Sequence, residues 1–69
     1  MSESEQTPEA AQSDLRAYGL AMRRGQVTRA ADIEKRWGLY GYPPEIVSTV
    51  LSCVATGLPL DAAIDEATA

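Results

Sequence analysis

Few residues of this chain could take part in catalysis or bind a metal. The 69-residue sequence has no histidine and a single cysteine, Cys53. Without histidine the usual general base is missing, and one cysteine cannot form an intramolecular disulfide or a thiolate zinc cluster. No loop has Asp, Asn and Gly at the spacing of a calcium site. We therefore expect a protein that is not an enzyme, with no catalytic residue, no metal and no cofactor.

The densest group of unusual side chains is the segment 37–44, which we call the aromatic turn. It holds Trp37, Tyr40 and Tyr42 around Gly41. Glycine lets the backbone bend without a Cβ clash, and the aromatic rings can either pack inward or present an apolar surface to a partner. The sequence leaves both roles open. We take Trp37, Tyr40, Gly41 and Tyr42 as the candidate partner-binding residues.

The charges are unevenly distributed along the chain. All six basic residues lie within residues 15–36, where Asp32 and Glu34 reduce the local charge to +4, while the whole chain carries −4. The candidate basic face consists of Arg23, Arg24, Arg29, Lys35 and Arg36. Such residues could contact phosphates, an acidic protein, or only solvent. The acidic total is unlike the basic balance of a typical nucleic-acid-binding domain.

Helix signals divide the chain into four segments. Thr7 can cap a first helix that begins at Pro8, and Thr28 can cap a second. Prolines and glycines mark the remaining starts and ends. The pattern predicts helices at about 8–24, 29–38, 44–56 and 60–67.

These segments predict an all-α fold, a small four-helix domain over residues 7–69. The broad apolar surface of the third helix indicates a central element that packs against neighbours on two sides. We expect helices two to four to form a compact three-helix core and the first helix to pack across it. Residues 1–6 are polar and acidic, and we expect a disordered tail there.

The segment from Ile33 to Ala67 resembles the ubiquitin-associated (UBA)-like three-helix module. The resemblance rests on Ile33 and Trp37 one turn apart, on Tyr40-Gly41-Tyr42 as a hydrophobic-Gly-aromatic turn, on Val47 with Val50-Leu51, and on Ala63-Ile64-Asp65. It implies a non-catalytic domain that binds a protein through this turn and the last helix.

A second resemblance is to the helix-turn-helix of small winged-helix regulators. It covers Val27 to Leu58, with Val27-Thr28-Arg29-Ala30 entering one helix, Gly38-Leu39 ending it, and Glu45 to Val54 as the next helix. The resemblance implies that this second helix would lie in the DNA major groove.

The function that we infer from the sequence is a protein-binding adaptor or regulatory module, with bacterial or phage origin as one option. The alternative is a helix-turn-helix transcriptional regulator that binds DNA. We expect a protein partner and leave homo-oligomers and nucleic acid open. With neither a secretory signal nor an apolar run that could span a membrane, we expect a cytoplasmic location.

Overall fold

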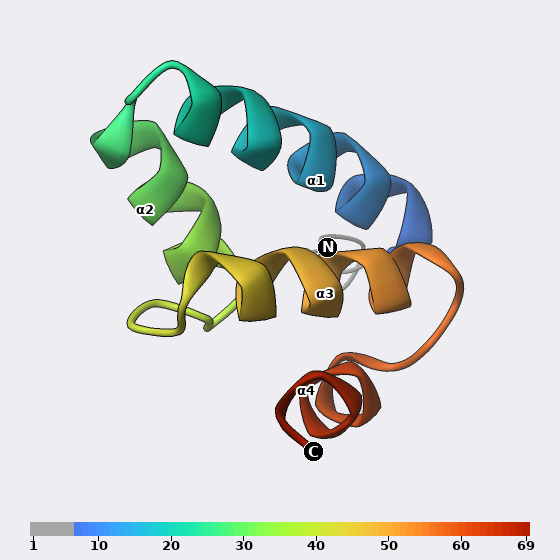
Figure 1. The fold of residues 1–69 in the computed structure, drawn as a ribbon. Helices are drawn as coiled ribbons and strands as arrows, with labels where there is room; N and C mark the ends of the chain where they lie inside the picture. The colour runs from blue at the N-terminus through green and yellow to red at the C-terminus, as the bar shows by residue number, and fades with distance from the viewer. Residues whose placement is uncertain (1–6) are drawn as a thin grey trace.

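The computed structural model describes residues 7–69, all of whose regular elements are α-helices (Figure 1). The predicted tail at residues 1–6 lies outside the described residues. The four helices are α1 (Pro8–Arg23), α2 (Val27–Arg36), α3 (Pro44–Ala55) and α4 (Leu60–Thr68). The prediction of an all-α four-helix domain is confirmed. None of the described helices is long and apolar enough to cross a membrane.

The predicted start of α1 agrees with the structure, but that of α2 does not. Thr7 Oγ1 accepts a hydrogen bond from the Ala10 amide at 3.1 Å, and Pro8 is the first helical residue. Helix α2 begins at Val27, so Thr28 lies within its first turn instead of capping it. The reason is local, since only Arg24, Gly25 and Gln26 lie between the last residue of α1 and the first residue of α2.

Helices α1, α2 and α3 end in the same way. A glycine adopts a left-handed backbone conformation, and the amide of the residue after it donates a hydrogen bond to a carbonyl of the preceding helix. Gly38 has φ of 70°, and the Leu39 amide then donates to the Glu34 carbonyl at 2.7 Å. This is the Schellman arrangement, which satisfies carbonyls that a helix end would otherwise leave exposed. It also turns Leu39 into the core, where it is fully buried.

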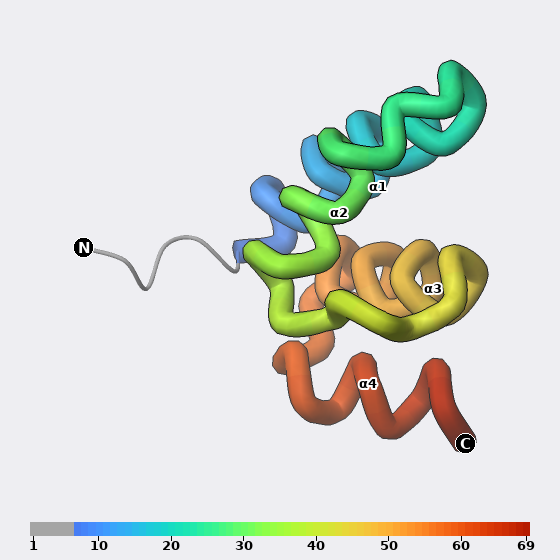
Figure 2. Tube along the Cα trace, turned by 90° about the vertical axis from the view of Figure 1, so that its left-hand side faces the viewer, coloured from blue at the N-terminus to red at the C-terminus, as the bar shows by residue number. Residues whose placement is uncertain are grey.

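Packing is organised around the pair α1 and α3. The extensive helix contacts join α1 to α3, α3 to α4, and α1 to α2. Figure 2 shows α2 beside α1, and α4 on the side of α3 that faces away from α1. The expectation that helices two to four form the core, with the first helix across it, is therefore wrong. Helix α1 is itself a wall of the core, because its contacts with α3 are more extensive than those of any other pair of the four helices.

The core combines two large aromatic side chains with many small ones. Tyr18 and Trp37 are each 1 % exposed, and no other fully buried side chain is as large. The buried residues are Ala11, Tyr18, Ala21, Ala30, Ile33, Trp37, Leu39, Val47, Val50, Leu51, Val54 and Ala63. In a chain with no Phe, these two aromatics supply much of the buried apolar area.

The glycines allow a paired test of the helix ends. Gly19 lies inside α1, and a Cβ added there meets no atom within 4 Å, whereas Gly38 requires positive φ. We expect Gly19→Ala to raise the free energy of unfolding by about 0.5–1 kcal/mol, and Gly38→Ala to lower it by about 1 kcal/mol or more. Urea unfolding followed by circular dichroism measures both. Changes of the same sign in the two variants would contradict this account of the helix ends.

Candidate binding groove

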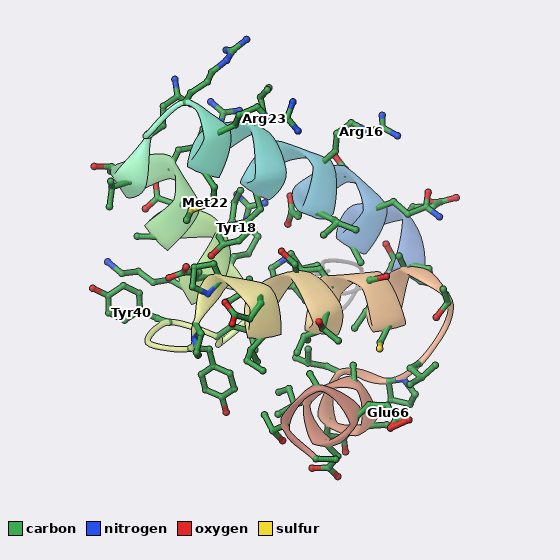
Figure 3. The ribbon with its side chains drawn as sticks, viewed as in Figure 1. Arg16, Tyr18, Met22, Arg23, Tyr40 and Glu66 are labelled. Carbon is green, nitrogen blue, oxygen red and sulfur yellow. The ribbon has the colours of Figure 1, made fainter. Side chains whose placement is uncertain are left out.

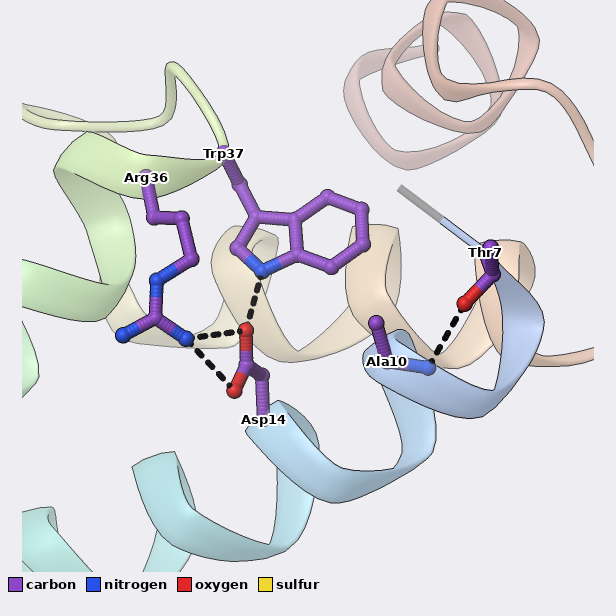
Figure 4. A network of polar contacts seen from close by, with 5 residues as sticks. All are labelled: Thr7, Ala10, Asp14, Arg36 and Trp37. Carbon is purple, nitrogen blue, oxygen red and sulfur yellow. Dashed lines mark hydrogen bonds and ion pairs between the residues drawn. The ribbon is translucent and has the colours of Figure 1, made fainter. Parts of the chain in front are cut away.

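The carboxylate of Asp14 holds the end of α2 against α1 (Figure 4). The indole Nε1–H of Trp37 donates to Asp14 Oδ2 at 2.7 Å. Arg36 Nη1 donates to both carboxylate oxygens, at 3.0 and 2.9 Å. The Asp14 side chain is only 13 % exposed, and hydrogen bonds to a charged acceptor in such a site are among the stronger ones. This cluster fixes the indole inside the core.

A second polar contact joins the same two helices further along. The Tyr18 hydroxyl donates to Glu34 Oε2 at 2.7 Å. Burial raises the pKa of the Tyr18 phenol, and the hydrogen bond to Glu34 and its negative charge raise it further. The phenol therefore stays protonated over the physiological range, and it keeps the Glu34 carboxylate in one position.

Beyond this contact, α1, α2 and the aromatic turn enclose a groove of about 320 Å³. Met22 reaches it from α1, and Tyr40 from the turn that follows α2 (Figure 3). Helix α2 contributes Val27, Ala31 and Glu34 among others, and Ala21 of α1 and Gln26 between the two helices also line it. Among residues 7–69, Glu34 is the only charged residue that lines it. We call this feature the Met22–Tyr40 groove.

The groove gathers exposed apolar side chains. Met22 is 44 %, Val27 75 % and Tyr40 63 % exposed. Among the described residues, the only other exposed large hydrophobic residues are Leu20 and Tyr42. Single exposed apolar residues are ordinary on a protein surface, but several around one concave site are typical of a binding surface.

The four predicted partner-binding residues do not lie together at one site. Trp37 is buried, so its side chain serves the core and the Asp14 cluster. Tyr40 lies on the groove, with Lys35 Nζ 5.1 Å from its ring centroid. Gly41 has φ of 98° and lets the chain turn back, and Tyr42 is 37 % exposed outside the groove lining. Only Tyr40 of this set lines the groove.

The basic residues do not gather on one surface either. Arg29 and Arg36 border a second pocket together with Asp14 and Asp32. Lys35 instead lies over Tyr40. Arg23 and Arg24 lie at the end of α1, and Figure 3 shows Arg23 pointing away from α3, as Arg16 does. Lys35 and Arg36, two consecutive residues of the predicted basic face, therefore have different neighbours.

Asp14, Met22 and Val27 were not among the residues predicted from the sequence to form a site. An acid on the same helical stripe as Ala11 and Tyr18 was the available signal for Asp14, because a buried charge requires partners. Nothing comparable marked Met22 and Val27, because their exposure depends on how α1 and α2 cross. Within residues 7–69 no three His, Cys, Asp or Glu side chains come together as a metal-binding group.

No protein-family model matches the chain, and neither the curated proteins nor the solved structures gave a match.

The Asp14 cluster predicts a specific loss of stability. Asp14→Ala leaves the buried Trp37 N–H without its acceptor, which costs about 1–3 kcal/mol in the free energy of unfolding. Asp32→Ala, on the exposed side of α2, is the matched control and should change it by less than about 0.5 kcal/mol. Urea unfolding followed by Trp37 fluorescence measures both. Equal stability of the two variants would refute a structural role for the cluster.

The Tyr18 contact predicts a pH dependence. Below pH 10.0, the ordinary tyrosine pKa, the folded and unfolded states both keep the phenolic proton. Above it the unfolded chain releases the proton first, so Tyr18 lowers the stability by up to about 1.4 kcal/mol per pH unit. The stability difference between the wild type and Tyr18→Phe should be constant from pH 7 to 9 and should shrink from pH 10 to 11. Urea titrations at each pH test this, and a constant difference up to pH 11 would contradict it.

Proposed function

We propose that this chain is a non-catalytic protein-binding module, and that a partner docks in the Met22–Tyr40 groove. The observation that carries the proposal is the grouping of Met22, Val27 and Tyr40 around one concave, largely apolar site. A partner that inserts apolar side chains there removes these groups from water, which is the main favourable term in protein association. Of the four residues predicted from the sequence, only Tyr40 lines this groove, where Met22 and Val27 join it.

The groove walls are held in place before a partner arrives. The Asp14 cluster and the Tyr18–Glu34 hydrogen bond both fix α2 against α1, and the Schellman turn at Gly25 fixes the link between the two helices. A preformed site loses little conformational entropy on binding. This rigidity supports a recognition role for a domain of this size.

Partner capture with matched variants tests the proposal. The tagged protein is exposed to an extract of its native host, and bound proteins are identified by mass spectrometry. We expect Val27→Ser and Tyr40→Ala each to reduce capture of the specific partner at least tenfold, since central contacts are worth about 1.4 kcal/mol or more.

Two control variants separate the groove from other apolar surface. Leu20→Ser removes an exposed apolar side chain on α1 outside the groove lining, and Tyr42→Ala removes the other exposed tyrosine of the aromatic turn. Both should retain the partner. Retention by the Val27 and Tyr40 variants with loss by Tyr42→Ala would move the contact away from the groove.

The burial of individual residues supports the UBA-like resemblance, but the way in which the helices pack does not. Val47, Val50 and Leu51 are fully buried, and Gly41 adopts positive φ as a bending glycine should. Direct packing of α2 on α3 or α4 is absent from the extensive helix contacts. The resemblance therefore stays a proposal about the turn and α3.

The alternative function is DNA binding by a helix-turn-helix of α2 and α3. Arg29 on α2 is exposed and favours it, but α3 presents Glu45, Thr49 and Ser52 to solvent and no basic residue. We expect a gel-shift titration with mixed-sequence duplex DNA at low salt to show no retarded complex. A complex that weakens with added salt and with Arg29→Gln would instead support DNA binding.

A further inference from the structure

We propose that the segment that docks in the Met22–Tyr40 groove is an amphipathic helix carrying an arginine, whose guanidinium pairs with the carboxylate of Glu34. This inference rests on the proposed function and adds the chemical class of the partner.

The position of Glu34 carries the argument. It is half-buried and is the only charged residue among the apolar and neutral groups that line the groove. A docked partner would remove this carboxylate from water. An ionised carboxylate that loses water without a compensating charge costs several kcal/mol. A purely apolar partner would therefore be penalised, and a partner that supplies a cation would not.

The protein itself leaves this requirement unmet. The Tyr18 hydroxyl supplies one hydrogen bond to Oε2, whereas a carboxylate can accept about four. The neighbouring cations have other contacts, since Lys35 lies over the Tyr40 ring and Arg36 binds Asp14. Among the described residues, Arg36 forms an ion pair with Asp14, and Glu34 forms no ion pair.

Arginine suits the walls of the groove better than a compact ammonium group. Its planar guanidinium pairs with carboxylates through two parallel hydrogen bonds and also stacks on aromatic rings. Glu34 borders the groove and offers the paired hydrogen bonds, and the Tyr40 ring, which already has Lys35 Nζ 5.1 Å from its centroid, borders the same groove. Met22, with its flexible thioether side chain, can adapt to the aliphatic part of the arginine and to its apolar neighbours.

A helix is the form of partner that this fold can accept. Residues 7–69 contain no strand, so they offer no sheet edge to which an extended peptide could add. A groove of about 320 Å³ accommodates a few side chains from one face of a helix.

Two designed peptides test the inference. Both are 14-residue amphipathic helices of Leu, Ala and Gln, and they differ at one central position, which is arginine in one and its neutral isostere citrulline in the other. Each is titrated into the ¹⁵N-labelled full chain, as wild type, Glu34→Gln, Val27→Ser and Leu20→Ser. Glu34→Gln keeps an acceptor for Tyr18, and its amide spectrum reports whether the fold is retained.

We expect the arginine peptide to shift the amides of Met22, Val27, Ala31 and Tyr40, and to bind the wild type roughly five- to tenfold more tightly than the citrulline peptide. Glu34→Gln should abolish this preference without weakening the citrulline peptide. Leu20→Ser should behave as wild type.

The other outcomes separate the two proposals. If both peptides bind in the groove equally well, and Glu34→Gln changes neither, the cationic partner is refuted while the groove remains a binding site. If Val27→Ser leaves both affinities unchanged, or if neither peptide shifts the groove amides at millimolar concentration, the proposed function fails together with this inference.

Discussion

The buried carboxylate of Asp14 is the constraint on which the arrangement of α1 and α2 depends. A charge in a nearly dry position is tolerated only when its oxygens have strong donors, and here the donors come from two consecutive residues at the end of α2, Arg36 and Trp37. Satisfying the carboxylate therefore sets both the rotation of α2 about its axis and its position along α1. Once that rotation is set, Ile33 turns inward and Glu34 comes within reach of Tyr18. The second polar contact follows from the first.

This dependence on polar contacts is understandable in so small a domain. A short chain buries a smaller fraction of its surface than a long one, and its hydrophobic core alone gives limited stability. Several buried positions where the helices meet are alanines, among them Ala11, Ala21, Ala30 and Ala63, which allow close backbone approach but contribute little apolar area each. Non-directional packing of small side chains also specifies helix rotation poorly. Hydrogen bonds from Trp37 and Tyr18, the two largest buried residues, specify the rotation of the helices, which contacts between alanines do not.

The sequence was sufficient for the local features of the fold and insufficient for its long-range ones. Helix starts at Pro8 and Pro44 and helix ends at Gly25, Gly38 and Gly57 depend on neighbours a few residues away, and they were predicted to within a few residues. The start of α2 was missed because Thr28 is a good cap in isolation, whereas the preceding Schellman turn begins the helix earlier. The role of α1 was misjudged because stripe patterns show that a helix has a buried face and not which helix covers it. For the candidate site, the sequence pattern of the aromatic turn identified Tyr40. It could not identify Met22 or Val27, because these two residues become neighbours of Tyr40 only when α1 and α2 pack together.

The burial of Trp37 also determines where a binding surface can form. The aromatic turn contains three rings, and the hydrogen bond to Asp14 requires the largest of them to face inward. The chain then reverses at Gly41, and Tyr40 lines the groove together with Glu34 and with Met22 from the end of α1. The same rotation of α2 that satisfies one carboxylate in the core thus places a second carboxylate, Glu34, on an apolar surface with a single protein donor. One acid is satisfied by the fold, and the other is left with hydrogen-bonding capacity that a partner can fill.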